Sequence, residues 1–269
     1  MKINGRGIGA EHPCYIIAEI SANHQQEFDK AIGLIYAAQK AGADAVKLQT
    51  YTPDILVNKG DERYDLYSKA YMPWEWQPKL KKLADQIGIT LFSTVYDNTA
   101  VDFLENMGVP AYKIASLELT NLELIRYVAQ KGKPMILSTG LGTIEEIRSA
   151  VETALNAGLP TWQIALLKCS VIYPTPPENM NLGAIPKMQQ VFGIPVGLSN
   201  HNLDRAIPIT AVALGASIIE QHITFDKKSI DGYFSLLPEE FTQMVQDVRI
   251  TEKSLGAFIG PTELEKPKL

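Results

Sequence analysis

One pattern constrains the fold more than any other: short apolar runs alternate with amphipathic segments along the whole chain. We predict eight strands from these runs, at residues 15–20, 45–50, 90–94, 111–116, 135–139, 164–169, 196–200 and 217–222. The segment after each run has helical periodicity. Strands that alternate with helices are typical of a parallel sheet covered by helices.

The helical segments also carry signals at their ends. Residues 28–42 place apolar side chains on one face and end at Gly42. In residues 143–158, Thr143 is a predicted N-cap, and Glu146 three residues later has the spacing of a capping box. The helices therefore begin and end between the predicted strands.

Eight strand–helix units predict an α/β fold with a single (β/α)8 (TIM) barrel over residues 1–258 and a polar tail over residues 259–269. A doubly wound open sheet is the alternative. It is disfavoured because the first strand is followed by SANHQ rather than by a G-x-G-x-x-G fingerprint. We expect the long connection over residues 51–76 to be an ordered loop across the barrel.

Composition excludes several classes of function. The chain has 30 acidic and 25 basic residues, a net charge of -5, which argues against a nucleic-acid-binding surface. It has no apolar run long enough to cross a bilayer, and its first residues lack the features of a signal peptide. Cys14 and Cys169 fit no metal or redox spacing, so a reducing cytosol is the predicted compartment.

In a barrel of this kind the active site lies at the carboxyl ends of the strands. The polar residues predicted there are Glu19, Ser21, Asn23, His24, Lys47, Gln49, Ser93, Thr94, Lys113, Ser116, Glu118, Ser138, Thr139, Lys168, Ser170, Ser199, His201, Glu220 and His222. Strands of a parallel sheet are normally continuous runs of apolar residues. So many polar residues at the strand ends therefore indicate a binding site.

Three lysines within strands point to an anion. Lys47, Lys113 and Lys168, together with nearby hydroxyls, suit the oxygens of phosphate and carboxylate groups. Taken singly, each lysine could instead be ion-paired or extend to solvent. Cys169 is interpreted as a structural thiol, because no histidine lies near it in sequence.

Two of the four histidines stand at or just beyond the ends of successive strands. His201 and His222 would converge on one cleft and form a site for a divalent metal such as Mn, Fe, Co or Zn. Open positions of that metal would be available for Lewis-acid chemistry. The alternative is that both imidazoles form hydrogen bonds with the backbone.

The sequence also resembles a known family. The stretches that carry the resemblance are IAEISANH, AGADAVKLQTYTPD, YMPWEW, VPAYKIASLE, GKPMILSTG, GLSNHNLDRA, AVALGASIIEQHIT and DGYFSLLPEEF. They resemble the sialic acid synthase family, the condensing enzymes for nonulosonic acids, and within it the pseudaminic acid synthase branch. The resemblance implies a barrel that condenses phosphoenolpyruvate with the open-chain aldehyde of an N-acetylated amino sugar and releases phosphate.

The resemblance implies roles for residues at the strand ends. It predicts His201 and His222 as ligands of a divalent metal, with manganese expected and magnesium or cobalt as alternatives. Predicted catalytic residues are Glu19, Lys113, Glu118 and Glu220. Predicted substrate-binding residues are Lys47, Gln49, Thr94, Lys113, Ser116, Ser138, Tyr173, Ser199 and Asp231.

Members of the family commonly continue into a C-terminal antifreeze-like domain that reaches across a dimer. No stretch of this sequence matches that domain, so we predict the barrel alone and, with less support, a homodimer. Two other functions stay open from the sequence. One is a Schiff-base aldolase or lyase that acts on a 2-keto acid through Lys168, and the other is a non-catalytic barrel that binds a sugar phosphate.

Overall fold

A closed barrel of eight parallel strands forms the centre of the molecule, in the order β10-β3-β4-β5-β6-β7-β8-β9. The structure is a computed structural model that describes residues 1–256, 260 and 262–265. The strands are β3 (Tyr15–Glu19), β4 (Ala45–Thr50), β5 (Thr90–Val95), β6 (Tyr112–Ile114), β7 (Met135–Ser138), β8 (Ile164–Cys169), β9 (Val196–Asn200) and β10 (Ile218–His222). The predicted barrel is confirmed, whereas the predicted boundary between residues 258 and 259 lies outside the described residues.

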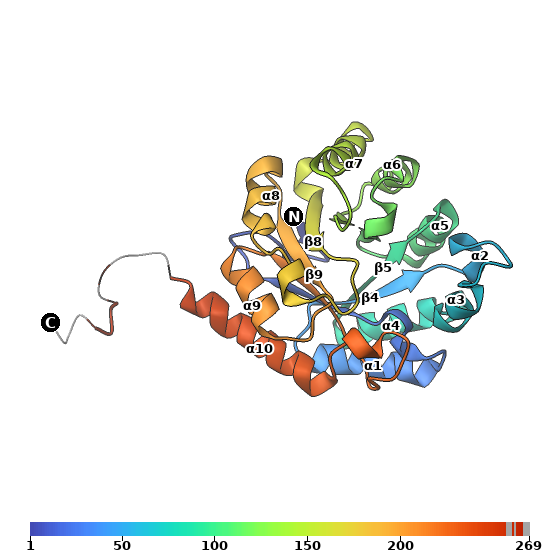
Figure 1. The fold of residues 1–269 in the computed structure, drawn as a ribbon, viewed down its shortest axis with the longest axis horizontal. Helices are drawn as coiled ribbons and strands as arrows, with labels where there is room; N and C mark the ends of the chain where they lie inside the picture. Colours follow the sequence, from blue (N-terminus) through green and yellow to red (C-terminus); the bar gives the residue numbers. More distant parts are fainter. Residues whose placement is uncertain (257–259, 261, 266–269) are drawn as a thin grey trace.

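Helices surround the strands (Figure 1). They are α1 (Phe28–Lys40), α4 (Gln77–Ile87), α5 (Asn98–Met107), α6 (Leu122–Ala129), α7 (Ile144–Asn156), α8 (Ala184–Phe192), α9 (Ala206–Ala213) and α10 (Pro238–Ser254). The predicted capping box is confirmed at α7, where the Thr143 amide donates to Glu146 at 2.8 Å and the Glu146 amide donates to the Thr143 hydroxyl at 3.2 Å. None of the helices in the described residues combines the length and apolar character that a bilayer span requires.

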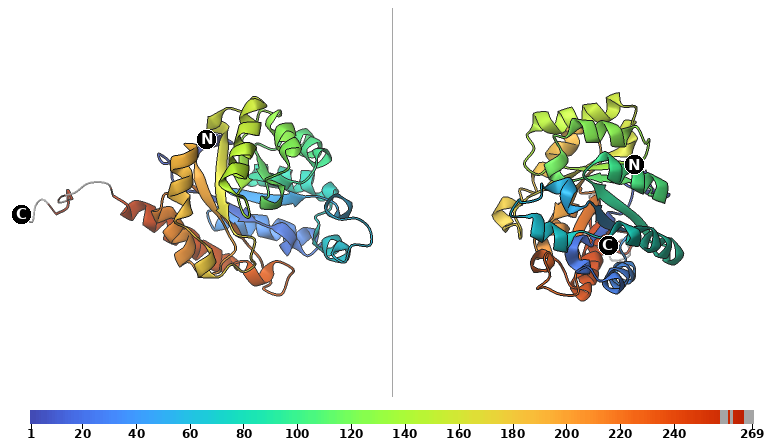
Figure 2. Two further views of the ribbon diagram at one scale, coloured as in Figure 1. Left: turned by 45° about the horizontal axis from the view of Figure 1, so that its top comes forward. Right: turned by 90° about the vertical axis from the view of Figure 1, so that its right-hand side faces the viewer.

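The connection between β4 and α4 differs from the prediction. It contains two short helices, α2 (Pro53–Leu56) and α3 (Tyr64–Ala70), and a 3-10 turn, η2 (Trp74–Trp76), rather than a loop. These helices stand out from the side of the barrel (Figure 2). The Gln26 side chain donates to the Ser68 carbonyl at 2.8 Å, and the Trp74 indole donates to the Tyr51 carbonyl at 3.1 Å. These bonds hold the segment at the mouth of the barrel.

The two ends of the barrel are covered differently. A small hairpin, β1 (Lys2–Ile3) and β2 (Arg6–Gly7), lies before the first barrel strand and buries Ile3 and Ile8. At the carboxyl end the chain forms the 3-10 turns η1 (Ser21–His24), η3 (Ser116–Glu118), η5 (Pro177–Asn179) and η6 (Gly232–Phe234), while η4 (Thr161–Gln163) precedes β8. The carboxyl end is therefore built from short turns and loops. Binding and catalytic residues are commonly found on such loops, which the rigid barrel holds in place.

Strand register brings the polar residues together. Side chains of a strand alternate between the barrel interior and the helix layer, and neighbouring strands keep the same alternation. Glu19 is paired in register with Lys47 and with His222, and Gln49 is paired with Thr94. Polar side chains from separate strands consequently meet at one level, above an apolar barrel core.

Candidate active site

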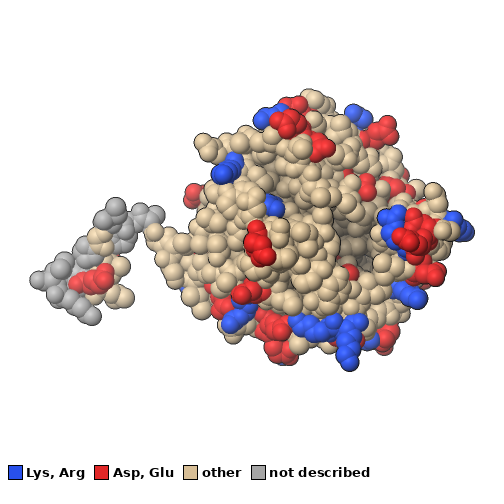
Figure 3. Space-filling model, in the orientation of Figure 1, with Lys and Arg blue, Asp and Glu red and all other residues tan. Residues whose placement is uncertain are grey.

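A cavity of about 420 Å³ opens at the carboxyl ends of the strands. The face viewed in Figure 3 is hollowed, and its charged side chains lie mainly toward the margin. The predicted site residues that line the cavity are Lys47, Gln49, Thr94, Lys113, Ser116, Ser138, Tyr173, Ser199, His201, Glu220, His222 and Asp231. Most of the predicted site is thus assembled in one place.

Two buried lysines form the floor of this cavity. Lys47 donates to the Thr94 hydroxyl at 2.7 Å and forms an ion pair with Glu19. Lys113 donates to the Ser138 hydroxyl at 2.6 Å. Burial lowers the pKa of the Lys113 ammonium group. Burial acts in the same direction on Lys47, but the nearby carboxylates of Glu19 and Glu220 outweigh it, so the pKa of Lys47 is raised. Two lysines beside hydroxyl groups are well suited to the oxygens of an anion.

The two buried carboxyl groups differ in ionisation. Burial raises the pKa of Glu220, but Lys113 and Lys47 outweigh this effect and lower it, so the group is ionised. One Glu220 oxygen accepts from the Ser199 hydroxyl at 2.9 Å. The other lies 3.8 Å from Lys47 and 3.9 Å from Lys113 and has no hydrogen bond.

Glu19 is fully buried beneath the lining residues. One of its oxygens accepts from the Ser21 amide at 3.0 Å, and the other is paired with Lys47. Burial raises the pKa of Glu19 to about 7, against the opposing effect of Lys47. A carboxyl group with a pKa near neutrality is suited to proton transfer.

The two predicted metal ligands meet in the structure, with ring centroids 5.3 Å apart. His201 Nδ1 lies 2.9 Å from the Ser170 carbonyl, which can only accept, so Nδ1 carries a proton. His222 Nδ1 is buried with no hydrogen-bond partner. Burial, followed by the charge on His201, lowers the pKa of His222 well below its usual range, so the ring is neutral.

The features of His222 fit a ligand of a metal. A neutral histidine with an unpartnered buried nitrogen is the form that binds a metal. Within the described residues, no group of three or more His, Cys, Asp and Glu side chains is arranged to hold an ion. A metal bound by His201 and His222 would therefore keep positions for water or substrate oxygen.

Cys169 also lines the cavity, and although no histidine lies near it in sequence, His201 is its neighbour in space. Burial raises the pKa of Cys169, but the hydrogen bond and charge of His201, with Ser116 and Lys113, together outweigh burial and lower the pKa to about 7. In His201 burial lowers the pKa, but Cys169, the Ser170 carbonyl and Glu220 together outweigh burial and raise it. Cys169 and His201 are distant in sequence. They meet because Cys169 ends β8 and His201 directly follows the neighbouring strand β9, and the predicted barrel order already implied that these strands are neighbours.

Of the residues predicted to have a catalytic, binding or metal role, three are not among those that line the cavity: Glu19, which is buried beneath it, Lys168 and Glu118. Lys168 is next to the inward-facing Cys169 on β8, so alternation turns it toward the helix layer, where its ammonium group donates to the Cys169 carbonyl at 2.8 Å. The prediction that Lys168 belongs to the anion pocket, or acts as a Schiff-base nucleophile there, is wrong. Glu118 lies on η3 outside the lining residues and accepts from the Asn121 amide at 2.9 Å.

Aromatic residues that the sequence analysis missed form one wall of the cavity. Tyr51 contacts Tyr67 and Tyr96 edge-on, with ring centroids 6.0 and 5.4 Å apart. Tyr67 is on α3, so the helical connection contributes directly to the site. On the opposite wall, Tyr173 packs on His201 at 4.4 Å, and Phe234 contacts His222 at 4.8 Å.

Asp231 completes the outer part of the cavity. Its carboxyl group accepts from the Ala22 amide at 3.3 Å, which ties the loop after β10 to η1. Burial raises its pKa. The inner cavity therefore presents cations and imidazoles, whereas the outer part presents aromatic rings and one carboxyl group.

Comparisons with known proteins agree with this geometry. Residues 34–259 match the NeuB family. The chain is 41% identical to a pseudaminic acid synthase from Campylobacter jejuni over 258 residues, covering 90% of this chain and 75% of that protein. It is 37% identical to an N,N'-diacetyllegionaminic acid synthase from Legionella pneumophila, covering 95% of this chain and 77% of that protein.

A solved structure is similar over nearly its full length. It is N-acetylneuraminic acid synthetase from Leptospira borgpetersenii in complex with citrate, with a TM-score of 0.93 and 31% identity. The match covers 100% of this chain and 94% of that one. With its barrel and its cluster of lysines, hydroxyls and imidazoles, the chain belongs to the NeuB family.

Proposed function

We propose that the protein condenses phosphoenolpyruvate with the open-chain aldehyde of an N-acetylated amino sugar, to give a nonulosonic acid and phosphate. One observation carries the proposal: a cavity in which two buried lysines and two imidazoles face the same space. The synthase names of the relatives support this reaction class. We also propose the cytosol as the compartment, which suits the two free, buried cysteines.

The lysines would hold phosphoenolpyruvate. Its phosphate and carboxylate groups are anions, and Lys47 and Lys113 are already oriented by hydrogen bonds to Thr94 and Ser138. Exclusion of water strengthens these charge-assisted bonds. The same lysines would stabilise the phosphate as it leaves.

We propose His201 and His222 as the ligands of a divalent metal, with manganese, magnesium and cobalt as candidates. When bound, such an ion acts as a Lewis acid toward a carbonyl oxygen. The unpartnered Nδ1 of His222 supports this assignment.

Glu19 would act as the base in the second half of the reaction. The C3 carbon of the enol phosphate forms a bond with the aldehyde carbon, and the aldehyde oxygen takes up a proton from solvent. Water then adds to C2 and gives one of its protons to Glu19. The C2–O bond to phosphate breaks, and the remaining hydroxyl proton leaves with the phosphate, which yields the C2 keto group. A pKa of about 7 lets Glu19 accept a proton and release it again near neutrality.

A phosphate-release assay tests the proposal. Phosphoenolpyruvate is supplied with N-acetylmannosamine or with N,N'-diacetylated amino sugars, with and without Mn²⁺, and the acid product is identified by mass spectrometry. We expect phosphate and acid in equal amounts, and no turnover after chelation. Tight binding of phosphoenolpyruvate without product from any of these sugars would refute the condensation and favour a binding protein.

A further inference from the structure

Tyr96 lies at the first position after β5 and lines the cavity, although neither the predicted site nor the proposed steps include it. Alternation along the strand places it on the same side as Thr94. Thr94 is paired in register with Gln49 on β4. Tyr96 is thereby directed across the end of Gln49 toward β3.

A chain of hydrogen bonds runs from Tyr96 to the proposed base. The Tyr96 hydroxyl donates to Gln49 Oε1 at 3.2 Å, and Gln49 Nε2 donates to Glu19 Oε1 at 3.3 Å. An ionised carboxyl group only accepts, so the amide must present its NH₂ group to Glu19 and its oxygen to another donor. Tyr96 is that donor, and it fixes which way the amide faces.

Neighbouring residues hold both Tyr96 and Glu19, the two ends of this series of hydrogen bonds, in place. The Tyr51 ring packs edge-on against Tyr96, and Tyr51 is itself anchored by the indole of Trp74. At the other end, the same Glu19 oxygen that receives Gln49 also receives the Ser21 amide. A hydroxyl group can also accept, so the amide could reverse when Glu19 carries a proton, without loss of either bond.

We propose that Tyr96 is a positioning residue for the condensation: it orients Gln49, which orients the carboxyl group of Glu19. This inference rests on the proposed function, in which Glu19 accepts the proton of the attacking water. Loss of the hydroxyl group would leave Gln49 without its fixed orientation and would slow the step that uses Glu19. It would leave the lysines that hold phosphoenolpyruvate in place.

The test is a double-mutant cycle with Tyr96→Phe and Gln49→Ala. We expect Y96F to lower kcat about tenfold, the cost of one hydrogen bond, with the KM for phosphoenolpyruvate changed less than about twofold. In the Q49A background, Y96F should cost less than about twofold, because the residue it acts through is gone. Tyr127→Phe, which removes a hydroxyl bonded to Asp102 outside the cavity, is the matched control and should leave kcat unchanged.

Two results would overturn the proposal: a Y96F enzyme with wild-type kcat, or an equal loss in both backgrounds, which would indicate direct contact with substrate. The same cycle measured by urea unfolding checks the bonded chain without turnover. If the wild-type protein makes no product, the proposed function and the catalytic role of Tyr96 fail together. In that case, a coupling free energy between Y96F and Q49A in urea unfolding would still establish the hydrogen bonds from Tyr96 through Gln49 to Glu19. No coupling in urea unfolding would refute these hydrogen bonds as well.

Discussion

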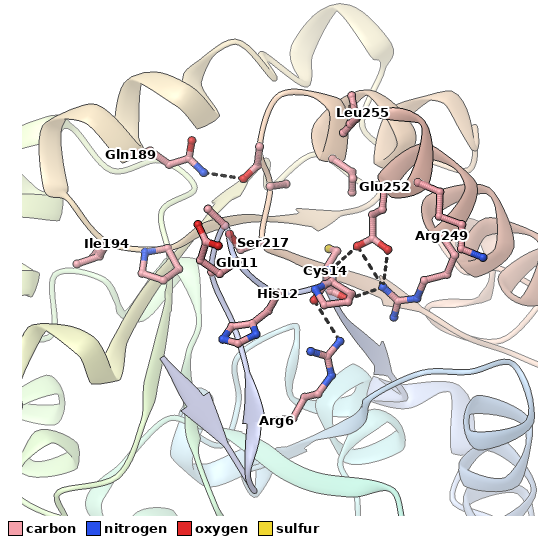
Figure 4. Close-up of a pocket in the computed structure, with 18 of the residues that line it drawn as sticks. Arg6, Glu11, His12, Cys14, Gln189, Ile194, Ser217, Arg249, Glu252 and Leu255 are labelled. Carbon is pink, nitrogen blue, oxygen red and sulfur yellow. Dashed lines mark hydrogen bonds and ion pairs between the residues drawn. The ribbon is translucent and has the colours of Figure 1, made fainter. Parts of the chain in front are cut away.

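Both ends of the barrel contain ion-paired clusters of charged side chains, but in the cluster at the carboxyl end a carboxylate oxygen and an imidazole nitrogen are buried without hydrogen bonds. At the amino end, Arg249 on α10 donates to the Cys14 carbonyl at 2.7 Å and to Glu252 at 3.1 Å (Figure 4). Arg249 also donates to Asp44 at 3.2 Å, and Asp44 receives Arg6 at 3.1 Å. Arg6, Arg249 and Glu252 border an open depression of about 1180 Å³, and each of these three charges has a partner of opposite charge.

The cluster at the carboxyl end is left incomplete. One oxygen of Glu220 and Nδ1 of His222 are buried without hydrogen bonds. A buried polar atom without a partner costs about 1–3 kcal/mol, and because Glu220 and His222 line the cavity, a ligand there would supply the missing partner. The charged residues at the larger depression therefore hold α10 against the N-terminal segment. The smaller cavity, at the carboxyl end, is the candidate active site. The predictions below test this contrast.

The largest effect should follow loss of an imidazole. We expect His222→Ala to lower kcat/KM roughly 1,000-fold, because a Lewis acid contributes several kcal/mol to such a reaction. Calorimetry with Mn²⁺ should show loss of binding in the same variant. His12→Ala, at the edge of the amino-end depression, is the matched control and should change neither quantity. Equal Mn²⁺ binding by H222A and the wild-type protein would contradict the assignment.

The next effect concerns the anion. Lys113→Met should weaken phosphoenolpyruvate binding about 100-fold, since truncating a buried, hydrogen-bonded charge costs about 2–3 kcal/mol in affinity. Titration calorimetry gives the dissociation constant. Lys133→Met is the matched control, because Lys133 is paired with Glu105 at 2.8 Å and does not line the cavity. The affinity of this variant for phosphoenolpyruvate should equal that of the wild-type protein. Equal weakening in both variants would mean that overall charge, rather than the cavity, attracts the ligand.

At the amino end the same kind of change should act on stability. Arg249→Met should lower the free energy of unfolding by about 2 kcal/mol, through the loss of bonds to Cys14, Asp44 and Glu252, and turnover should be unaffected. This corresponds to a Tm lower by about 4–8 °C, measured by calorimetry. Arg63→Met breaks an exposed pair with Asp61 and should leave the Tm unchanged. An R249M protein with wild-type stability but impaired turnover would contradict the assignment of a structural role to the amino-end cluster.

The sequence predicted the barrel well because each strand is a short apolar run bounded by clear helix signals. It failed where local pattern is weak: α2 and α3 have 4 and 7 residues, too few to show helical periodicity, and contacts such as Tyr51 with Tyr67 hold them. Lys168 was misplaced because a strand buried on both faces gives no sign of which residues face inward. The partnership of Cys169 with His201 depends on the adjacency of β8 and β9, which the predicted barrel order implies but no local stretch of the sequence shows.

The smallest effect is a dependence on pH. Burial raises the pKa of Glu19 to about 7, and a base must be ionised to accept a proton. The ionised fraction falls from about one half at pH 7 to about one tenth at pH 6, so kcat should fall about fivefold over that interval. Glu19→Gln should be far slower and should lack this limb. A wild-type rate that is flat between pH 6 and 7 would exclude Glu19 as the base.

The same shift fixes the sign of a stability effect. The folded protein holds the Glu19 proton more tightly than the unfolded chain, in which the carboxyl group has its ordinary pKa of 4.5. This contribution to stability is complete below pH 4.5 and is lost as the pH rises through 7. E19Q should therefore lose less stability than the wild-type protein between pH 5 and 8 in urea unfolding. Arg249→Met, at the amino end, should keep the wild-type slope, because arginine stays charged throughout this pH interval.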